Sequence, residues 1–226
     1  MIGTPRVHWR LTDSTNERAK ELADAGALHG TLVTADEQSA GRGRQGRAWT
    51  APPGSAVLMS LILRDLDERH ALLPLAAAVA VCEALPVDAA IKWPNDVWID
   101  RRKVAGILIE GRPQEGWAVL GIGINVTTDS FPAELAEIAT SLQLAGHATT
   151  AAAVLTDLLA ALDRWICAPP GPVLEAWRSR DALKGERVRW SDGEGIAGGI
   201  DDSGALVVET DHGPVTLDAG EVHLFR

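Results

Sequence analysis

Residues 90–125, AIKWPNDVWIDRRKVAGILIEGRPQEGWAVLGIGIN, decide the fold of this chain. They divide into four closely spaced strand-like runs: Ala90–Lys92, Asp96–Ile99, 103–110 and Trp117–Asn125. The polar link Asp100-Arg101-Arg102 between the second and third runs predicts a hairpin. Four such runs in succession predict a β-sheet with short connections.

Segments before and after this stretch add helices and further strands. Upstream, the apolar patterns predict strands near residues 7–9, 31–35 and 56–63, and helices over 13–26 and 72–85. The first of these helices has cap-type residues at Ser14, Thr15 and Asn16 and a stop signal at Gly26. Downstream, helices are predicted over 149–166 and 173–180.

The chain changes character from about Lys184. Alternating runs at 186–190, 195–200, 205–210 and 215–217, separated by Gly and Asp, predict a small all-β domain. The predicted fold class is therefore α+β: a mixed β-sheet backed by helices over residues 1–182, followed by a small barrel-like β domain over residues 183–226.

Composition describes an ordinary globular protein. The 226 residues are 46% hydrophobic and 23% charged, and their net charge is −10. No run is long enough for a membrane helix, and the N-terminus lacks the features of a secretory signal, which predicts a cytoplasmic protein. Cys82 and Cys167 are expected to be reduced core residues, and the scattered histidines predict no zinc site.

A glycine-rich loop at residues 35–49 is suited to wrapping an anion. Three glycines allow sharp turns and close backbone approach, and three arginines add forked cationic donors; they are Gly41, Gly43, Gly46, Arg42, Arg44 and Arg47. The spacing matches a dinucleotide fingerprint, but Pro52, Pro53 and Gly54 forbid the helix that such a site needs. No Walker lysine follows either. The alternative is a solvated surface loop.

Three further elements bring polar groups or bare backbone into the predicted sheet. Lys92-Trp93-Pro94-Asn95-Asp96 fixes four polar or aromatic side chains at a strand end, although a plain turn would explain it too. In Arg102-Lys103-Val104-Ala105-Gly106, a lysine enters a buried strand beside a glycine. Gly121-Ile-Gly-Ile-Asn125 places two glycines inside a strand, which predicts either close ligand approach or a β-bulge.

These elements together resemble the biotin protein ligases, also called biotin–[acetyl-CoA-carboxylase] ligases, in a short form without an N-terminal DNA-binding domain. The resemblance spans nearly the whole chain. It is carried by five elements that occur in the family's order and approximate spacing: Asp13-Ser-Thr-Asn16, Gln38-Ser-Ala-Gly-Arg-Gly-Arg44, Lys92 to Asp96, Lys103 to Leu108 and Gly121 to Val126. By the same resemblance, the C-terminal β domain is expected to be SH3-like.

The resemblance implies roles for particular residues. Those implied at the biotin site are Ser14, Thr15, Asn16, Gln38, Gly41, Arg42, Gly43, Arg44, Lys103, Gly106 and Gly121. Those implied at the ATP site are Arg42, Arg44, Arg47, Trp49, Lys92, Asn95, Asp96 and Asn125. The implied catalytic residues are Lys103, Arg44 and Arg42. No metal ligand is assigned.

The implied reaction has two steps. Biotin attacks the α-phosphate of Mg²⁺-bound ATP to give biotinyl-5′-AMP, and a lysine of a biotin carboxyl carrier domain then attacks this anhydride. The acceptor belongs to an acetyl-CoA, acyl-CoA or pyruvate carboxylase. Two anions meet in the first step, which accounts for the clustered cations. The chain is expected to be a monomer or homodimer that binds neither DNA nor membranes.

Two other functions remain open from the sequence. A lipoate protein ligase has a similar fold and the same adenylate chemistry, although the arginine loop and Lys92 to Asp96 favour biotin. A biotin-binding module without turnover would need neither Lys103 nor Arg44. A DNA-binding regulator is disfavoured by the acidic charge and by the few residues before Asp13.

Overall fold

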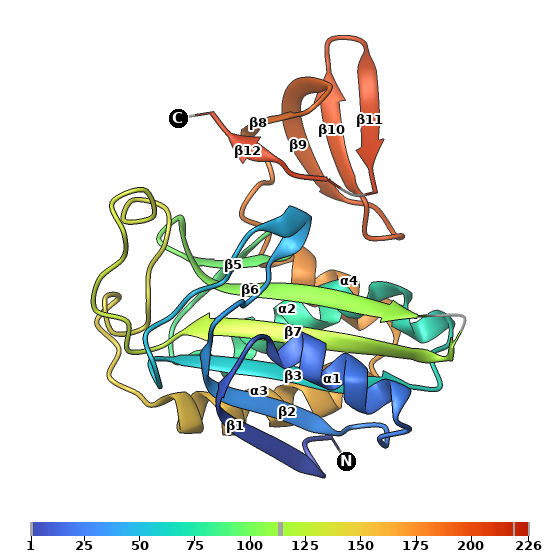
Figure 1. Cartoon of the computed structure of the whole chain (residues 1–226). Helices are drawn as coiled ribbons and strands as arrows, with labels where there is room; N and C mark the ends of the chain where they lie inside the picture. Colours follow the sequence, from blue (N-terminus) through green and yellow to red (C-terminus); the bar gives the residue numbers. More distant parts are fainter. Residues whose placement is uncertain (1, 113–114, 219, 226) are drawn as a thin grey trace.

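The chain forms two β-sheets, joined by helices and a short linker (Figure 1). The computed structural model describes residues 2–112, 115–218 and 220–225, without the side chains of residues 68 and 69. The first sheet has seven strands in the order β1-β2-β3-β7-β6-β5-β4. Only β1 and β2 pair in parallel; the other neighbours are antiparallel. The strands are β1 (Arg6–Thr12), β2 (Leu32–Gln38), β3 (Ala56–Arg64), β4 (Ala90–Lys92), β5 (Asp96–Ile99), β6 (Arg102–Arg112) and β7 (Trp117–Asn125).

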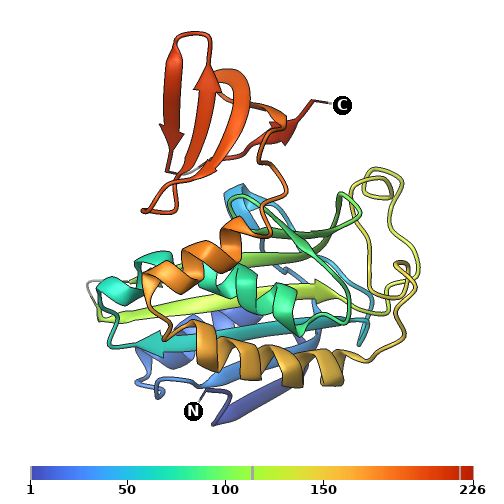
Figure 2. The same cartoon turned by 180° about the vertical axis from the view of Figure 1, so that it is seen from behind.

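Helices cover both faces of this sheet. On one face, α1 (Thr15–Asp24) packs on β2, β3 and β7. On the other lie α2 (Leu73–Ala84) and α3 (Ala151–Trp165), with α4 (Pro170–Arg178) against α2 (Figure 2). Two short 3₁₀ turns, η1 (Arg44–Gly46) and η2 (Glu68–Leu72), are also present. No helix in the described part of the chain is long and apolar enough to cross a membrane.

The centre of the sheet is buried on both faces, because β3 lies between α1 and the α2–α3 layer. Residues 56–63 of β3 are all buried, which explains their nearly continuous apolar sequence. Ser60 is the polar exception, at 0% exposure. Strand β7 pairs with β3 along its whole length and with β6 over eight residues. These three strands form the rigid platform on which the site residues lie.

The second sheet is a small antiparallel barrel-like unit at the C-terminus. Its order is β11-β10-β9-β8-β12. The strands are β8 (Arg187–Trp190), β9 (Gly193–Ile200), β10 (Leu206–Thr210), β11 (Gly213–Leu217) and β12 (His223–Leu224). The linker before it pairs with β4, since Ile91 N donates to Arg180 O at 2.7 Å and Ala182 N donates to Ile91 O at 2.9 Å.

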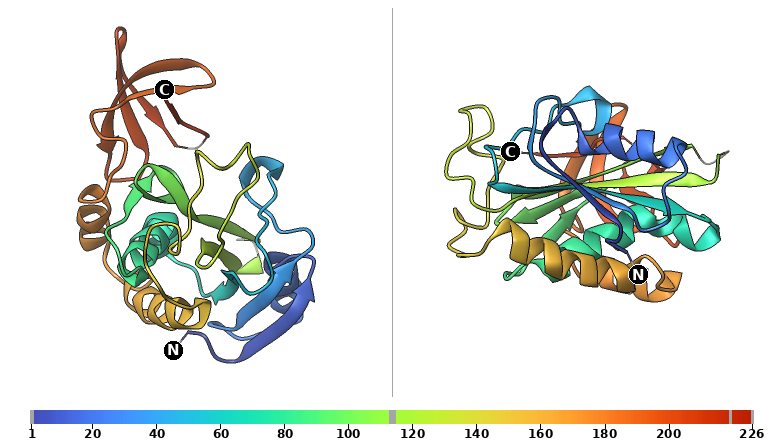
Figure 3. Two further views of the ribbon diagram at one scale, coloured as in Figure 1. Left: turned by 90° about the vertical axis from the view of Figure 1, so that its left-hand side faces the viewer. Right: turned by 60° about the horizontal axis from the view of Figure 1, so that its bottom comes forward.

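Direct contacts hold the C-terminal sheet against the first. The Trp93 indole Nε1 donates to Gly204 O at 3.1 Å. From α4, the Arg178 guanidinium donates to Ile200 O and to Asp202 Oδ1, the latter at 2.9 Å. Figure 3 shows this small domain standing above one end of the larger sheet. The C-terminal sheet therefore lies against the strand end that begins with Trp93.

The predicted fold class is confirmed, and so is each predicted helix and strand. The hairpin at Asp100 and Arg101 also forms, with φ values of 48° and 61°. One strand was not predicted, and one expectation is wrong. The two-residue strand β12 gave no signal of its own in the sequence. Cys167, expected in the core, is exposed because α3 ends at Trp165 and Cys167 lies in the turn before Pro169.

The two thiols should therefore differ in reactivity. Burial encloses Cys82 and raises the pKa of its thiol to about 12, whereas Cys167 is exposed. At pH 8 only about one Cys82 in ten thousand is thiolate, so it cannot act as a nucleophile. We expect a disulfide reagent to titrate one thiol in the native protein and two after denaturation. Cys167→Ser should remove the native titre, and a native titre that survives in this variant would contradict the assignment.

Candidate functional site

The glycine-rich loop after β2 folds back on itself. Trp49 N donates to Gly41 O at 2.9 Å and Gly43 N donates to Arg47 O at 2.7 Å, so the two ends of the loop are tied together. The tip is the 3₁₀ turn η1, where Gln45 and Gly46 have φ values of 55° and 75°. Main-chain hydrogen bonds thus close the loop, while the side chains of Arg42 and Arg47 are exposed and that of Arg44 is half-buried.

The three arginines of this loop contact three different parts of the protein. Arg42 pairs with Glu17 of α1, and its second nitrogen lies 3.9 Å from Glu110 of β6. Arg44 Nη1 donates to Asn95 Oδ1 at 3.3 Å. The Arg47 guanidinium pairs with Glu221 in the C-terminal sheet, just before β12.

Lys103 lies where the loop, β5 and β6 meet. Its ammonium is 2.6 Å from Asp96 Oδ1 and 5.6 Å from the centre of the Trp49 ring. The Trp49 indole N–H is buried and finds no acceptor among the described residues. A buried unpaired donor is costly, so this nitrogen is a natural partner for a ligand oxygen.

Two glycines of β7 make room for side chains that lie flat on the sheet. A Cβ at Gly121 would stand 2.1 Å from Asn16 Oδ1, and a Cβ at Gly123 would stand 2.5 Å from the Trp49 ring. Gly106 of β6 is similarly crowded by Trp49 and Lys103, at 3.0 and 3.1 Å. Both β7 glycines pair in regular register with β3 and β6. The β-bulge alternative is therefore wrong. The side chains of Asn16 and Trp49 approach these glycines closely, and the approach of a ligand stays a prediction.

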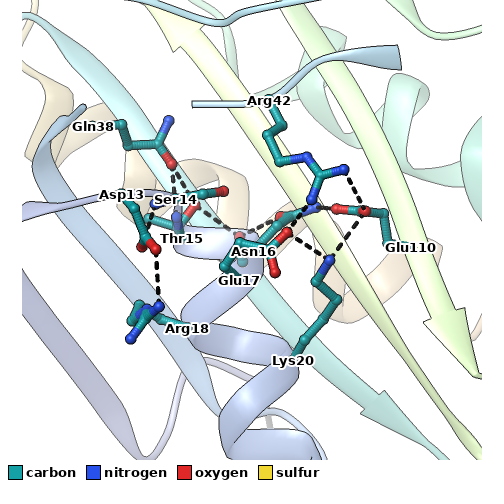
Figure 4. Close-up of polar contacts among 11 residues, drawn as sticks. Asp13, Ser14, Thr15, Asn16, Glu17, Arg18, Lys20, Gln38, Arg42 and Glu110 are labelled. Carbon is teal, nitrogen blue, oxygen red and sulfur yellow. Dashed lines mark hydrogen bonds and ion pairs between the residues drawn. The ribbon is translucent and has the colours of Figure 1, made fainter. Parts of the chain in front are cut away.

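A second polar group gathers at the N-terminus of α1 (Figure 4). Ser14 is the N-cap residue, but its side chain makes no capping hydrogen bond, so capping alone does not account for it. Thr15 N donates to Gln38 Oε1 at 2.7 Å, and the Thr15 hydroxyl lies 3.1 Å from the same oxygen. Ser14, Thr15 and Asn16 are all at most 4% exposed.

Charged residues flank this group and connect it to the arginine loop. Glu110 Oε2 accepts from Asn16 Nδ2 at 2.9 Å, while Lys20 bridges Glu110 and Glu17 at 3.2 and 2.7 Å (Figure 4). The hydrogen bonds from Lys20 and, less strongly, from Arg42 lower the pKa of Glu17 in spite of its partial burial. The biotin-type and ATP-type residues inferred from the sequence are thus physically linked.

Lys92 and Asn125 lie at the margins of the site. Burial lowers the pKa of Lys92; among the nearby charges, Asp96 opposes this effect and Lys103 adds to it. Its ammonium lies 5.7 Å from the centre of the Trp98 ring. Asn125 Nδ2 donates to Thr140 O at 3.0 Å, and Thr140 N donates to Lys103 O. Asn125 therefore holds the segment after β7 against the Lys103 strand.

Sequence reasoning missed several members of the site. Ser60 is the single hydroxyl in a buried apolar strand, a signal that was available. Glu110, Glu17 and Lys20 gave no local signal, because only the fold brings α1 beside the end of β6. Glu221 belongs to another sheet altogether.

A cavity adjoins the site at Arg44 and Asn95. This cavity of about 380 Å³ lies between the start of α2, β6 and the C-terminal sheet, with Arg44, Trp93, Asn95, Leu108 and Gly204 among its lining. Within the described ranges, no three His, Cys, Asp or Glu side chains gather as a metal site. The arrangement joins cations, bare backbone and neutral donors and acceptors, which suits a ligand with both an anionic and a neutral polar end.

Comparisons with known proteins agree with this chemistry. Residues 9–129 match the Biotin/lipoate A/B protein ligase family, and residues 185–224 match the Biotin protein ligase C terminal domain. The chain is 38% identical to the bifunctional ligase/repressor BirA of Bacillus subtilis, covering 99% of this chain and 75% of that protein. It is 35% identical to the biotin–[acetyl-CoA-carboxylase] ligase of Mycobacterium tuberculosis, covering 93% and 85%.

A solved structure extends the comparison to three dimensions. The biotin protein ligase of Aquifex aeolicus, in complex with biotin and ATP, superimposes with a TM-score of 0.87 at 29% identity and covers 99% of both chains. Sequence, C-terminal domain and fold therefore agree: this chain belongs to the Biotin/lipoate A/B protein ligase family and is one of its biotin protein ligases.

Proposed function

We propose that the chain joins biotin to ATP at the face formed by the arginine loop, β6 and β7, and passes the biotinyl group to a carrier lysine. The observation that carries this proposal is the convergence of Arg42, Arg44 and Lys103 with the neutral polar group at the start of α1. The first set suits phosphate and carboxylate, and the second suits a ureido ring.

In the first step, a carboxylate oxygen of biotin bonds to the α-phosphorus of Mg²⁺-bound ATP, and the bond to the β-phosphate breaks to release pyrophosphate. Lys103, held by Asp96, would neutralise charge between the biotin carboxylate and the α-phosphate. Arg42 and Arg44 would contact the phosphates. The unpaired Trp49 indole N–H offers a further donor. Five further residues would hold the nucleotide or the protein loops around it: Lys92, Asn95, Asp96, Arg47 and Asn125.

In the second step, the neutral amine of the acceptor lysine attacks the biotinyl carbonyl carbon, AMP leaves with the bonding electron pair, and the nitrogen loses one proton to the solvent to give the amide. We propose a lysine of a biotin carboxyl carrier domain of acetyl-CoA carboxylase as acceptor, because the Mycobacterium tuberculosis relative is named for that substrate. Related acyl-CoA and pyruvate carboxylases are further candidates.

Three further expectations belong to the proposal. The working division is residues 1–182 for catalysis and 183–226 for the SH3-like domain, supported by the linker contacts of Ile91 with Arg180 and Ala182. We propose a cytoplasmic enzyme, as its soluble composition suggests. That it is a monomer or homodimer without DNA binding stays a prediction.

Exchange of labelled pyrophosphate into ATP tests the first step. We expect exchange that requires biotin and that falls roughly 100- to 1,000-fold in Lys103→Ala, the usual cost of removing one stabilising contact. Lys184→Ala, outside the site, is the matched control. Exchange supported by lipoate and not by biotin would identify a lipoate ligase. Biotin binding without any exchange would indicate a protein that binds biotin but does not activate it.

Gly121 tests the close approach of Asn16 to the sheet. A methyl at this position would stand 2.1 Å from Asn16 Oδ1, so Gly121→Ala must displace Asn16. We expect about tenfold weaker biotin binding by calorimetry with the fold retained. Gly198→Ala, in a strand where the new carbon meets nothing closer than 3.4 Å, should bind normally. Equal affinity for biotin in the two variants would show that the position of Asn16 does not matter for biotin binding.

The arginine loop is the third test. Arg42 and Arg47 are exposed, and the contacts of Arg44 are few, so trypsin should cut within residues 42–50 in the free enzyme. Biotin with ATP should slow cutting about tenfold or more, because the adenylate must be shielded from water. Cleavage that is unchanged by saturating biotin and ATP would contradict loop closure.

A further inference from the structure

Glu110 is the end point of a chain of hydrogen bonds that starts in the proposed biotin pocket. Ser60 Oγ lies 2.8 Å from Thr15 Oγ1 and 2.6 Å from Asn16 Oδ1. The amide of Asn16 then donates from Nδ2 to Glu110 Oε2 at 2.9 Å (Figure 4). Thr15, Ser60 and Asn16 are buried, so water does not compete within this chain.

This series of hydrogen bonds, called the relay below, runs in one direction, which the Glu110 carboxylate imposes. An ionised carboxylate can only accept, so the Asn16 NH₂ group must face Glu110 and the amide oxygen must face Ser60. That oxygen can also only accept, and therefore the single Ser60 proton points to Asn16. Ser60 has then no proton left for Thr15.

Both protein neighbours of the Thr15 hydroxyl are consequently acceptors. Ser60 offers a lone pair, and Gln38 Oε1 is fixed toward Thr15 because it accepts from the Thr15 main-chain N–H at 2.7 Å. The Thr15 proton goes to one of these two oxygens, at 2.8 and 3.1 Å. What Thr15 presents to a ligand is a lone pair.

We infer that Glu110 is a positioning residue for ligand choice: through Asn16 and Ser60 it leaves the Thr15 hydroxyl without a protein side-chain donor and with a free lone pair, which favours a ligand with a ring N–H. This inference rests on the proposed function. The ureido ring of biotin offers such an N–H, whereas the dithiolane ring of lipoate does not. A site with a buried acceptor rejects a ligand that leaves it unpaired.

Glu17 provides a control that separates the direction of the hydrogen bonds from the effect of losing a negative charge. Its carboxylate contacts Lys20 and Arg42, as that of Glu110 does. Among the described contacts, however, Glu17 does not bond to Asn16, Ser60 or Thr15. Glu110→Gln and Glu17→Gln therefore remove the same charge beside the same cations, and only Glu110→Gln frees the Asn16 amide to turn over.

The test measures equilibrium binding by calorimetry without nucleotide, so that no chemistry intervenes. The probes are biotin and biotin methylated at each ureido nitrogen in turn. The readout is the ratio of the Kd of the methylated ligand to that of biotin. We expect Glu110→Gln to lower this ratio roughly tenfold, because the relay loses its fixed direction. Glu17→Gln should keep the wild-type ratio.

A second mutation checks that Glu110 acts through Ser60. In a Ser60→Ala background the relay is already cut, so Glu110→Gln should change the ratio no further. Thermal melts verify the fold of each variant, and Asn16→Ala, which cuts the same link, replaces Glu110→Gln if that variant is unfolded.

The outcomes distinguish the inference from the function on which it rests. An unchanged ratio in Glu110→Gln, an equal loss in Glu17→Gln, or an undiminished effect in the Ser60→Ala background would overturn the relay while leaving biotin binding intact. Failure of the wild-type protein to bind biotin would instead overturn the proposed function itself.

Discussion

The site depends on two positions of β7 that carry no side chain. Strands β3 and β7 are almost entirely buried, and an ordinary residue at position 121 or 123 of β7 would project into the space used by Asn16 or Trp49. With glycine there, an amide and an indole lie directly on the sheet. The rigid platform thus fixes one residue from α1 and one from the arginine loop, which are far apart in sequence.

Four cations of the site already have an acidic or polar partner in the protein. Lys103 has Asp96, Arg42 has Glu17 and Glu110, Arg44 has Asn95, and Arg47 has Glu221. Such pairing holds long side chains in defined positions, which reduces the entropy lost when an anion binds. It also means that a phosphate or carboxylate must compete with these partners, so the proposed loop closure exchanges contacts as well as adding them.

The C-terminal sheet contributes to the same region. Glu221 holds Arg47, and the main-chain oxygen of Gly204 accepts from the Trp93 indole. Desolvation lowers the pKa of His223, and the nearby Lys92 adds to this effect. Lys92, Arg47, Glu221 and His223 therefore form one electrostatic group across the two sheets. The ion pair between Glu221 and Arg47 links the small domain directly to the arginine loop.

The sequence by itself determined the elements and the type of chemistry. The periodicity of residues 56–63 and 90–125 predicted the strands because local pattern follows burial. The clustered glycines and arginines indicated an anion site, and the five motifs indicated the family. Tertiary structure decided which charges meet. Glu110 and Asn16 are 94 positions apart, and no local pattern encodes their contact. The same holds for Arg47 and Glu221, because only the packing of α1, the loop and the second sheet on one platform brings these groups together.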